Sequence, residues 1–318
     1  MTAIAATQAR DRLPRSRARG NHRSGAVASY AMLGPFLLVY LVFVLVPIVL
    51  GIVLSFTKWD GNGAIQFIGF TNYTNLAANK KTLQAFGNLF QFVAMAVPIA
   101  VVVGLSLAIF VDRFSGPAAT FLRAVLLLPF VMPLFLTAAI WLWMMVPQFG
   151  LFNQLTSVFG IGGIDWLSNP RYMVPALVIV ETWRSAGFNM LLFYAGLKAI
   201  PRETLEAARI DGANTFDEVR YIILPQIAPI TFIIAVNCFF GAFQIFDLPW
   251  LLSRSGFVEG QGGAGGGLLF PVMQSVASGF GSLRFGQAAA IGVLLLILIV
   301  ATTGLMFGAR ALWRRYRG

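Results

Sequence analysis

The sequence has little charge, one cysteine and one histidine, and each scarcity excludes a class of protein. Only 11% of the 318 residues are charged, whereas 58% are hydrophobic. Because a soluble domain carries about 25% charged residues, we predict an integral membrane protein. The single cysteine, Cys238, excludes an internal disulfide and a cysteine-based metal site, and the single histidine, His22, excludes a histidine metal cluster.

Signatures of catalysis are also missing from the sequence. It contains no G-x-x-x-x-G-K-S/T stretch, which is the loop that commonly holds the phosphates of ATP. No nucleophile stands in a pattern with a base, and no residues have metal-ligand spacing. We therefore expect no enzyme activity, no cofactor and no metal site in this chain.

Positive charge is concentrated at the N-terminus of a chain whose formal net charge is +11. We expect residues 1–28 to form a basic, disordered cytoplasmic tail. The uncharged run from Ala26 to Thr57 is too long for the core of a signal peptide, so we interpret it as an uncleaved first span. Anionic lipid headgroups suit the tail better than nucleic acid, which is not an expected partner. The arginines of the tail are Arg10, Arg12, Arg15, Arg17, Arg19 and Arg23.

Apolar runs long enough to cross a bilayer occur six times and predict an all-α membrane protein with six transmembrane helices. Prolines fall in or at the ends of several runs, which membrane helices tolerate when neighbouring groups satisfy the freed backbone. The predicted spans are 31–56, 87–111, 121–146, 173–196, 228–250 and 286–309.

The distribution of Lys and Arg predicts the orientation of these spans. With the N-terminus inside, sixteen of the 23 basic residues lie on the cytoplasmic side and six on the other side, and Arg184 lies within a span. Basic residues favour the cytoplasmic side of a membrane. We therefore expect both termini, and the loop that precedes residue 228, to be cytoplasmic.

That loop contains a polar stretch, residues 206–225, which reads EAARIDGANTFDEVRYIILP. Pro201 can begin a helix, Gly212 breaks it, and a second helix can restart at Thr215 with Glu218 at capping-box spacing. Pro225 marks the end of the second helix or a kink in it. From these residues alone, the stretch is either a solvated helical hairpin or a handle for a separate subunit.

The same stretch resembles the cytoplasmic EAA loop of binding-protein-dependent ABC importer permeases. Three further segments are similar in sequence to the same permeases: LLPFVMP at 127–133, ETWRSAGFNMLLFYAGLKAIP at 181–201 and GAFQIFDLPWLL at 241–252. The chain after residue 30 looks like the six-span permease of the maltose and glycerol-3-phosphate transporter type. The residues that carry the motif are Glu206, Ala207, Ala208, Asp211, Gly212, Ala213, Leu224 and Pro225.

This resemblance implies an ABC importer type I permease fold over residues 29–318, with a coupling loop at 198–226 that docks into a groove on the ATPase. It implies a place in a bacterial or archaeal cytoplasmic membrane, among its lipids, and a sugar or sugar derivative as cargo. Six spans make half of a pathway. The implied partners are therefore two copies of an ABC ATPase subunit, a second permease chain of different sequence, and an extracytoplasmic solute-binding protein.

Two stripes of residues are candidates for the solute path, because polar groups in a span tend to face a cavity or each other. Residues spaced by 3, 4 and 7 share one helix face, and in the resembling family these faces line the path. An internal ion pair and plain helix packing are the alternatives for the two stripes. The first stripe is Glu181, Arg184, Ser185 and Phe188, and the second is Cys238, Gly241, Ala242 and Ile245, with Asp247 beyond it.

Two further expectations follow from the sequence. The run GQGGAGGG at 260–267 is glycine-rich and predicts a flexible outer loop. The alternative function is an ion-coupled secondary transporter in which Glu181, Arg184 and Asp247 relay charge. The EAA resemblance and the absence of a visible inverted repeat argue against it.

Overall fold

The computed structural model describes residues 33–160, 163–253 and 262–317, and the chain divides into two compact units, 1–50 and 51–318. The predicted tail at 1–28 lies outside the described residues. The described part of the first unit is one apolar helix that starts at Leu33, passes through a π-helical turn at Leu41–Leu45 and continues into α2 (Val46–Ser55). Its large side chains are exposed, as in a helix that faces lipid.

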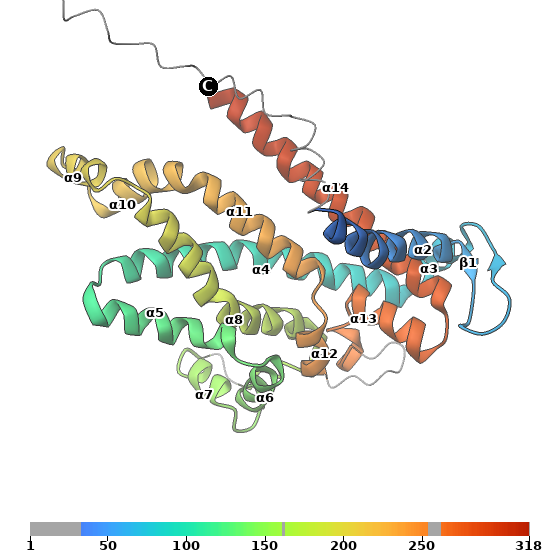
Figure 1. Ribbon diagram of the computed structural model, residues 1–318. Coiled ribbons are helices and arrows are strands. Elements are labelled where there is room, and N and C mark those ends of the chain that lie inside the picture. Colours follow the sequence, from blue (N-terminus) through green and yellow to red (C-terminus); the bar gives the residue numbers. More distant parts are fainter. Residues whose placement is uncertain (1–32, 161–162, 254–261, 318) are drawn as a thin grey trace, which may run out of the picture. The chain divides into compact units, whose positions relative to one another are not determined.

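The described residues of the second unit form helices and one small antiparallel sheet (Figure 1). In the sheet, β1 (Thr57–Lys58) pairs with β2 (Gln66–Phe67), and Thr57 lies opposite Phe67. The helices are α3 (Thr71–Ala78), α4 (Lys80–Asp112), α5 (Gly116–Val131), α6 (Leu134–Met144), α7 (Leu151–Ser157), α8 (Pro170–Lys198), α9 (Arg202–Ile210), α10 (Thr215–Asp217), α11 (Leu224–Phe243), α12 (Asp247–Ser253), α13 (Pro271–Val276) and α14 (Phe285–Arg317). Short π-helical turns occupy Glu218–Ile223 and Ala277–Gly281.

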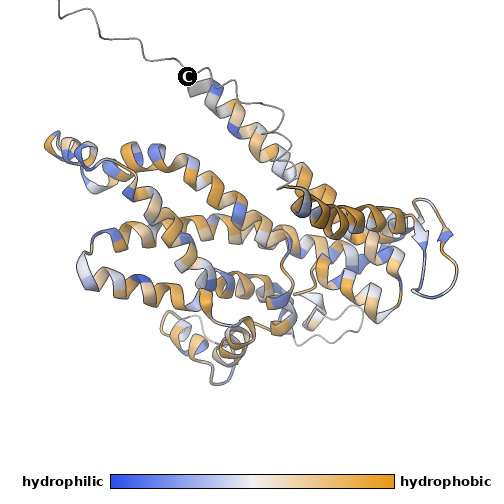
Figure 2. Ribbon diagram, viewed as in Figure 1, coloured by the Kyte–Doolittle hydropathy of each residue, from blue (hydrophilic) through white to orange (hydrophobic). Residues whose placement is uncertain are grey.

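Helices occupy all six predicted spans, and most of their residues are hydrophobic (Figure 2). Among the described residues, four helices are long and apolar enough to cross a membrane: Leu33–Ser55, Lys80–Asp112, Thr215–Phe243 and Phe285–Leu312. The bent pair α5 and α6 makes a fifth if it counts as one span. The 29-residue helix α8 has the necessary length, but polar residues in its middle lower its hydropathy.

The predicted third span, 121–146, is not a continuous helix. α5 and α6 meet at an angle of 94°, with Met132 and Pro133 between them. Met132 has an extended backbone, with ψ of 141°, because the ring of a following proline disfavours the helical conformation. The helix predicted over these residues is therefore broken in two, although the bent pair can still count as one span.

The predicted fifth span, 228–250, is also interrupted. α11 ends at Phe243, and a new helix, α12, begins at Asp247. An acidic residue at the start of α12 and Pro249 in its first turn both favour a helix N-terminus at this point. Gln244, Ile245 and Phe246 therefore form a non-helical link, which the sequence-based prediction had placed inside the helix.

The core of the second unit is built on the contact between α4 and α8, and α8 also packs against α5 and α11. Small buried residues recur every four positions along α4, at Ala96, Ala100, Gly104 and Ala108. A side-chain carbon added at Gly104 would lie 2.8 Å from Cβ of Asn189 on α8. The small residues therefore let the two helices approach closely, as is common between membrane helices.

The glycine-rich run is ordered by its neighbours in the part that the structure describes, Gly262–Gly267, so the prediction of a flexible loop is wrong there. Asn88 of α4 donates hydrogen bonds to the carbonyl oxygens of Gly266 and Leu269, over 2.9 and 3.0 Å. Gly263 has a φ of +73°, and a side-chain carbon there would lie 2.4 Å from Cε of Met173. The glycines are needed for close approach rather than for flexibility. Gly260 and Gln261 lie outside the described residues.

Candidate solute cavity and polar loop

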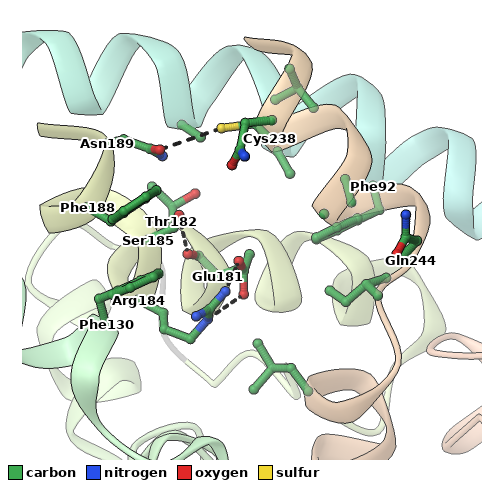
Figure 3. A pocket seen from close by; sticks show the side chains of 18 of the residues that line it. Phe92, Phe130, Glu181, Thr182, Arg184, Ser185, Phe188, Asn189, Cys238 and Gln244 are labelled. Atoms are coloured by element: carbon green, nitrogen blue, oxygen red, sulfur yellow. Dashed lines mark hydrogen bonds and ion pairs between the residues drawn. The ribbon is translucent and has the colours of Figure 1, made fainter. Parts of the chain in front are cut away.

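A cavity of about 400 Å³ lies among α4, α5, α8, α11 and α12. Figure 3 shows its side chains, with α8 contributing the wall that carries Glu181 and Arg184. All nine residues that the sequence predicts for a solute path line this one cavity. They are Glu181, Arg184, Ser185, Phe188, Cys238, Gly241, Ala242, Ile245 and Asp247.

Glu181 and Arg184 form an ion pair on the α8 wall of the cavity. Arg184 donates from Nε to Oε2 of Glu181 over 2.9 Å and from Nη2 to Oε1 over 2.6 Å. Each side chain exposes 22% of its surface. Charges that leave water need a partner, and this bidentate geometry supplies one. The two residues are therefore both an internal ion pair and part of the cavity wall.

An aromatic pair adjoins the ion pair. The rings of Phe130 on α5 and Phe188 on α8 stack with centroids 4.6 Å apart and planes 10° apart. The guanidinium carbon of Arg184 lies 5.7 Å from the centroid of the Phe130 ring, within the range of a cation–π contact. The sequence prediction missed Phe130, which lies in the last turn of α5.

Polar groups without partners mark the same wall. Asn189 is only 2% exposed, and its Oδ1 accepts a hydrogen bond from Sγ of Cys238 over 3.7 Å. Among the described residues, Nδ2 of Asn189 and Oγ1 of Thr182 have no hydrogen-bond partner. Asn189 follows Glu181 by eight residues, so extending the stripe by one helical turn would have identified it.

The link between α11 and α12 completes the cavity. Ile245 was predicted on the helical stripe of Cys238, yet it lies beyond the end of α11. It reaches the cavity because the chain turns after Phe243, which also brings Gln244 and Asp247 to the wall. The contact was predicted correctly, but the helical spacing on which that prediction relied does not extend to this residue.

The 198–226 segment contains the predicted helix, bend and second helix. α9 ends in a Schellman motif, in which the Ala213 N–H donates to the Ala208 carbonyl over 2.9 Å and the Gly212 N–H donates to the Arg209 carbonyl over 3.1 Å. Gly212 has a φ of +89°, a conformation that favours glycine. The bend at Gly212 is therefore a defined helix end.

The cap of the second helix differs from the prediction by one residue. Asn214 rather than Thr215 is the N-cap, and its side chain accepts from the N–H groups of Phe216 and Asp217 while Asp217 accepts from the N–H of Asn214. Asparagine is at least as good an N-cap as threonine. The helix does not end at Pro225, which lies in the first turn of α11 immediately after the π-helical turn.

A polar groove of about 600 Å³ adjoins α9 and the ends of α4 and α8. Within it, Arg209 donates from Nε to Oε1 of Glu218 over 2.5 Å and from Nη2 to Oε2 over 3.1 Å. This hydrogen bonding raises the pKa of the exposed Arg209 guanidinium. Lys198 pairs with Asp112 over 2.6 Å. One ion pair joins α9 to the π-helical turn that precedes α11, and the other joins α8 to α4.

The motif residues of this segment are mostly on its surface. Ala208 and Ala213 are half-buried, while the remaining motif residues are exposed: Glu206, Ala207, Asp211, Gly212, Leu224 and Pro225. Glu206 lines the groove. The sequence prediction missed two apolar side chains, Ile210 and Phe216, which are 86% and 67% exposed. Exposed apolar groups beside the bend suit a surface that another protein covers.

No group of three or more His, Cys, Asp or Glu side chains suitable for a metal ion occurs in 33–160, 163–253 and 262–317.

Comparison with known proteins gives consistent matches. Residues 100–317 match the family model described as "Binding-protein-dependent transport system inner membrane component". The trehalose/maltose transport system permease protein MalF of Thermococcus litoralis is 29% identical over 87% of this chain and 92% of its own length. The arabinooligosaccharides transport system permease protein AraP of Bacillus subtilis is 30% identical over 88% of this chain and 87% of its own length. The fold matches a chain of a bacterial alginate ABC transporter, crystallised with an alginate pentasaccharide-bound periplasmic protein. The TM-score is 0.74 and the identity 19%, over 92% of this chain and 96% of that one.

Proposed function

The chain belongs to the family of binding-protein-dependent transport system inner membrane components, and from that premise we propose that it forms half of the pathway of an ATP-driven sugar importer. The observation that carries this proposal is the cavity, which brings together nine separately predicted residues of α8, α11, α12 and the link between the last two helices. A cavity within a helical membrane protein, lined by polar and aromatic groups, is a common form of solute site.

The proposed cargo is a sugar or oligosaccharide. The names of related permeases refer to trehalose and maltose and to arabinooligosaccharides. The cavity suits such solutes because it combines aromatic rings at Phe130 and Phe188 with hydrogen-bonding groups at Ser185, Asn189 and Gln244. A sugar presents hydroxyl groups at its edge and C–H groups on its faces, so it needs both kinds of contact.

The proposed role of the 198–226 segment is coupling to two copies of a separate ATPase subunit. Its exposed motif residues, together with Ile210 and Phe216, provide the surface for docking. The Schellman motif and the Arg209–Glu218 ion pair hold α9 against the helix that continues into α11, which lines the cavity. A displacement of α9 by the ATPase would therefore reach the cavity wall through α11.

The proposed assembly also contains a second permease chain and an extracytoplasmic solute-binding protein. The binding protein is included because the family is one of binding-protein-dependent transport systems. The second permease is included because the cavity is open on one side, so a second chain can complete its lining. The excess of Lys and Arg supports cytoplasmic termini and a cytoplasmic 198–226 segment. The membrane is then the cytoplasmic membrane of a bacterium or archaeon.

The proposal is tested by isolating the complex through a tag on this chain in mild detergent, identifying its subunits and assaying ATP hydrolysis. We expect an ATPase subunit and a second permease to copurify, and Glu206→Lys to release the ATPase. A stable complex without an ATPase would contradict the proposal and favour an ion-coupled transporter.

A further inference from the structure

We propose that this chain's wall of the cavity selects neutral, hydroxyl-rich solutes over solutes that carry carboxylates. The inference deepens the proposed function and rests on it, because it concerns the cargo of the same cavity. The bacterial ABC transporter with a chain of this fold is involved in the import of the acidic polysaccharide alginate. A shared fold therefore leaves the charge of the cargo open, and the side chains of this cavity decide it.

The cationic group of the wall is already occupied. Arg184 directs Nε and Nη2 to the two carboxylate oxygens of Glu181, and the Phe130 ring adjoins its guanidinium group. A solute carboxylate could take this Nε–Nη2 face of the guanidinium only by displacing Glu181 from the bidentate pair. It would then leave Glu181, which is largely buried, without its counter-charge.

The remaining charge of the wall is negative. Within the described part of the chain, the cavity is lined by three charged side chains, Glu181, Arg184 and Asp247. The first two neutralise each other, and Asp247 has no ion-pair or hydrogen-bond partner among the described residues. The net charge of this wall is therefore negative. A carboxylate that entered would be repelled, and the repulsion is stronger in a partly dehydrated cavity than in water.

The neutral polar groups of the wall suit hydroxyl groups instead. Gln244 is exposed, Ser185 is half-buried, and both line the cavity. The Gln244 amide can donate or accept, and the Ser185 hydroxyl, which donates to the Glu181 carbonyl, can still accept. A sugar hydroxyl can therefore bond to either side chain without introducing charge.

The test uses two probes that differ at one carbon of each sugar unit, where a carboxylate is replaced by a CH2OH group: α-1,4-trigalacturonate and its carboxyl-reduced, neutral counterpart. Binding of each labelled trisaccharide is measured by equilibrium dialysis with the purified permease–ATPase complex, without the binding protein. We expect the neutral trisaccharide to bind at least about tenfold more tightly, given the charge of this wall. Equal affinities, tighter binding of the uronate or binding of neither probe would overturn the inference.

Two variants assign the preference to these residues. Glu181→Gln frees Arg184, and we expect it to reduce the affinity ratio of neutral to acidic probe by about tenfold. Asp247→Asn changes an exposed side chain and therefore tests the same charge without threatening the fold. We expect a reduction of about threefold.

Asp60→Asn, which removes an exposed carboxylate outside the cavity, is the matched control and should leave the ratio unchanged. An unchanged ratio in both cavity variants would overturn the inference. Copurification of the ATPase with this chain, measured separately, reports on the proposed function and is unaffected by the result.

Discussion

Arg209 of α9 and Glu218 of the following helix form a bidentate ion pair across the Gly212 bend, with N–O distances of 2.5 and 3.1 Å. Glu218 is buried, with 7% of its surface exposed, whereas the Arg209 side chain is 62% exposed. The pair connects an exposed surface to the helix that lines the cavity. In the proposed importer, it lies on the route from the ATPase to the solute.

Reversing one charge of this pair is expected to impair coupling. Glu218→Arg places two cations together, and α9 should then separate from the α11 helix. We expect ATP-driven sugar uptake in proteoliposomes to fall at least about tenfold. A loss of about 1.4 kcal/mol in the free energy that holds α9 in place already corresponds to a tenfold change in the equilibrium constant. Membrane insertion should persist. The double variant Arg209→Glu, Glu218→Arg should recover part of the loss.

Arg220→Ala is the control for that experiment, because Arg220 is exposed in the same segment and forms no ion pair with any residue that the structure describes. Its guanidinium carbon lies 5.7 Å from the centroid of the Tyr221 ring. Full uptake by Glu218→Arg, or a loss of the same size in Arg220→Ala, would argue against a specific role for the pair.

The same Gly→Ala change should have opposite effects on conformational stability at Gly212 and at Gly87. Neither position has an atom within 4 Å of an added side-chain carbon, but Gly212 has a φ of +89°. An alanine in this left-handed conformation costs about 1–2 kcal/mol, whereas an exposed helical glycine gains about 0.5–1 kcal/mol on replacement by alanine. We expect Gly212→Ala to lower ATP-driven uptake and Gly87→Ala to leave it intact. Equal uptake in both would contradict the assigned backbone conformation.

Gly187 and Gly241 provide a second matched pair, with Gly187 at the α5–α8 contact and Gly241 at the cavity. A side-chain carbon at Gly187 would lie 2.0 Å from the Leu126 carbonyl oxygen, whereas Gly241 has open space. We expect Gly187→Ala to destabilise the α5–α8 contact by about 1–3 kcal/mol and to lower the midpoint of thermal unfolding in detergent. Gly241→Ala should leave the midpoint unchanged. It should alter sugar uptake, because its methyl group enters the cavity.

Asn88 is expected to hold the glycine-rich loop in place. Its two hydrogen bonds to the Gly266 and Leu269 carbonyls contribute about 1–2 kcal/mol together, so Asn88→Ala should lower the thermal midpoint. Gln91→Ala, at an exposed position one turn further along α4, is the control and should leave it unchanged. Equal midpoints for the two variants would show that the loop is held by its packing alone.

Eight of the nine residues predicted for the solute path needed only the 3, 4 and 7 spacing on α8 and α11, or, for Asp247, the rule that charge in a span faces a cavity. Asn189 and Thr182 were missed because neutral polar residues stand out less from an apolar sequence than Glu181 and Arg184 do.

The interruptions of the helices were harder to predict. Prolines occur inside the continuous helices α4 and α8, at Pro98 and Pro175, and also at the break that contains Pro133. Sequence alone does not separate these cases, because neighbouring helices decide whether the freed backbone groups find partners. The order of Gly262–Gly267 depends likewise on contacts with Asn88 and Met173, which are remote in sequence.

The central claim is that this chain conducts sugar as part of an ATP-driven importer, and the most direct measurement is uptake by the reconstituted complex. The complex, purified through this chain, is placed in proteoliposomes with its binding protein and a labelled oligosaccharide. The account predicts uptake that requires ATP, is indifferent to ion gradients and is lost in Glu206→Lys. Uptake driven by a proton or sodium gradient without ATP would contradict it.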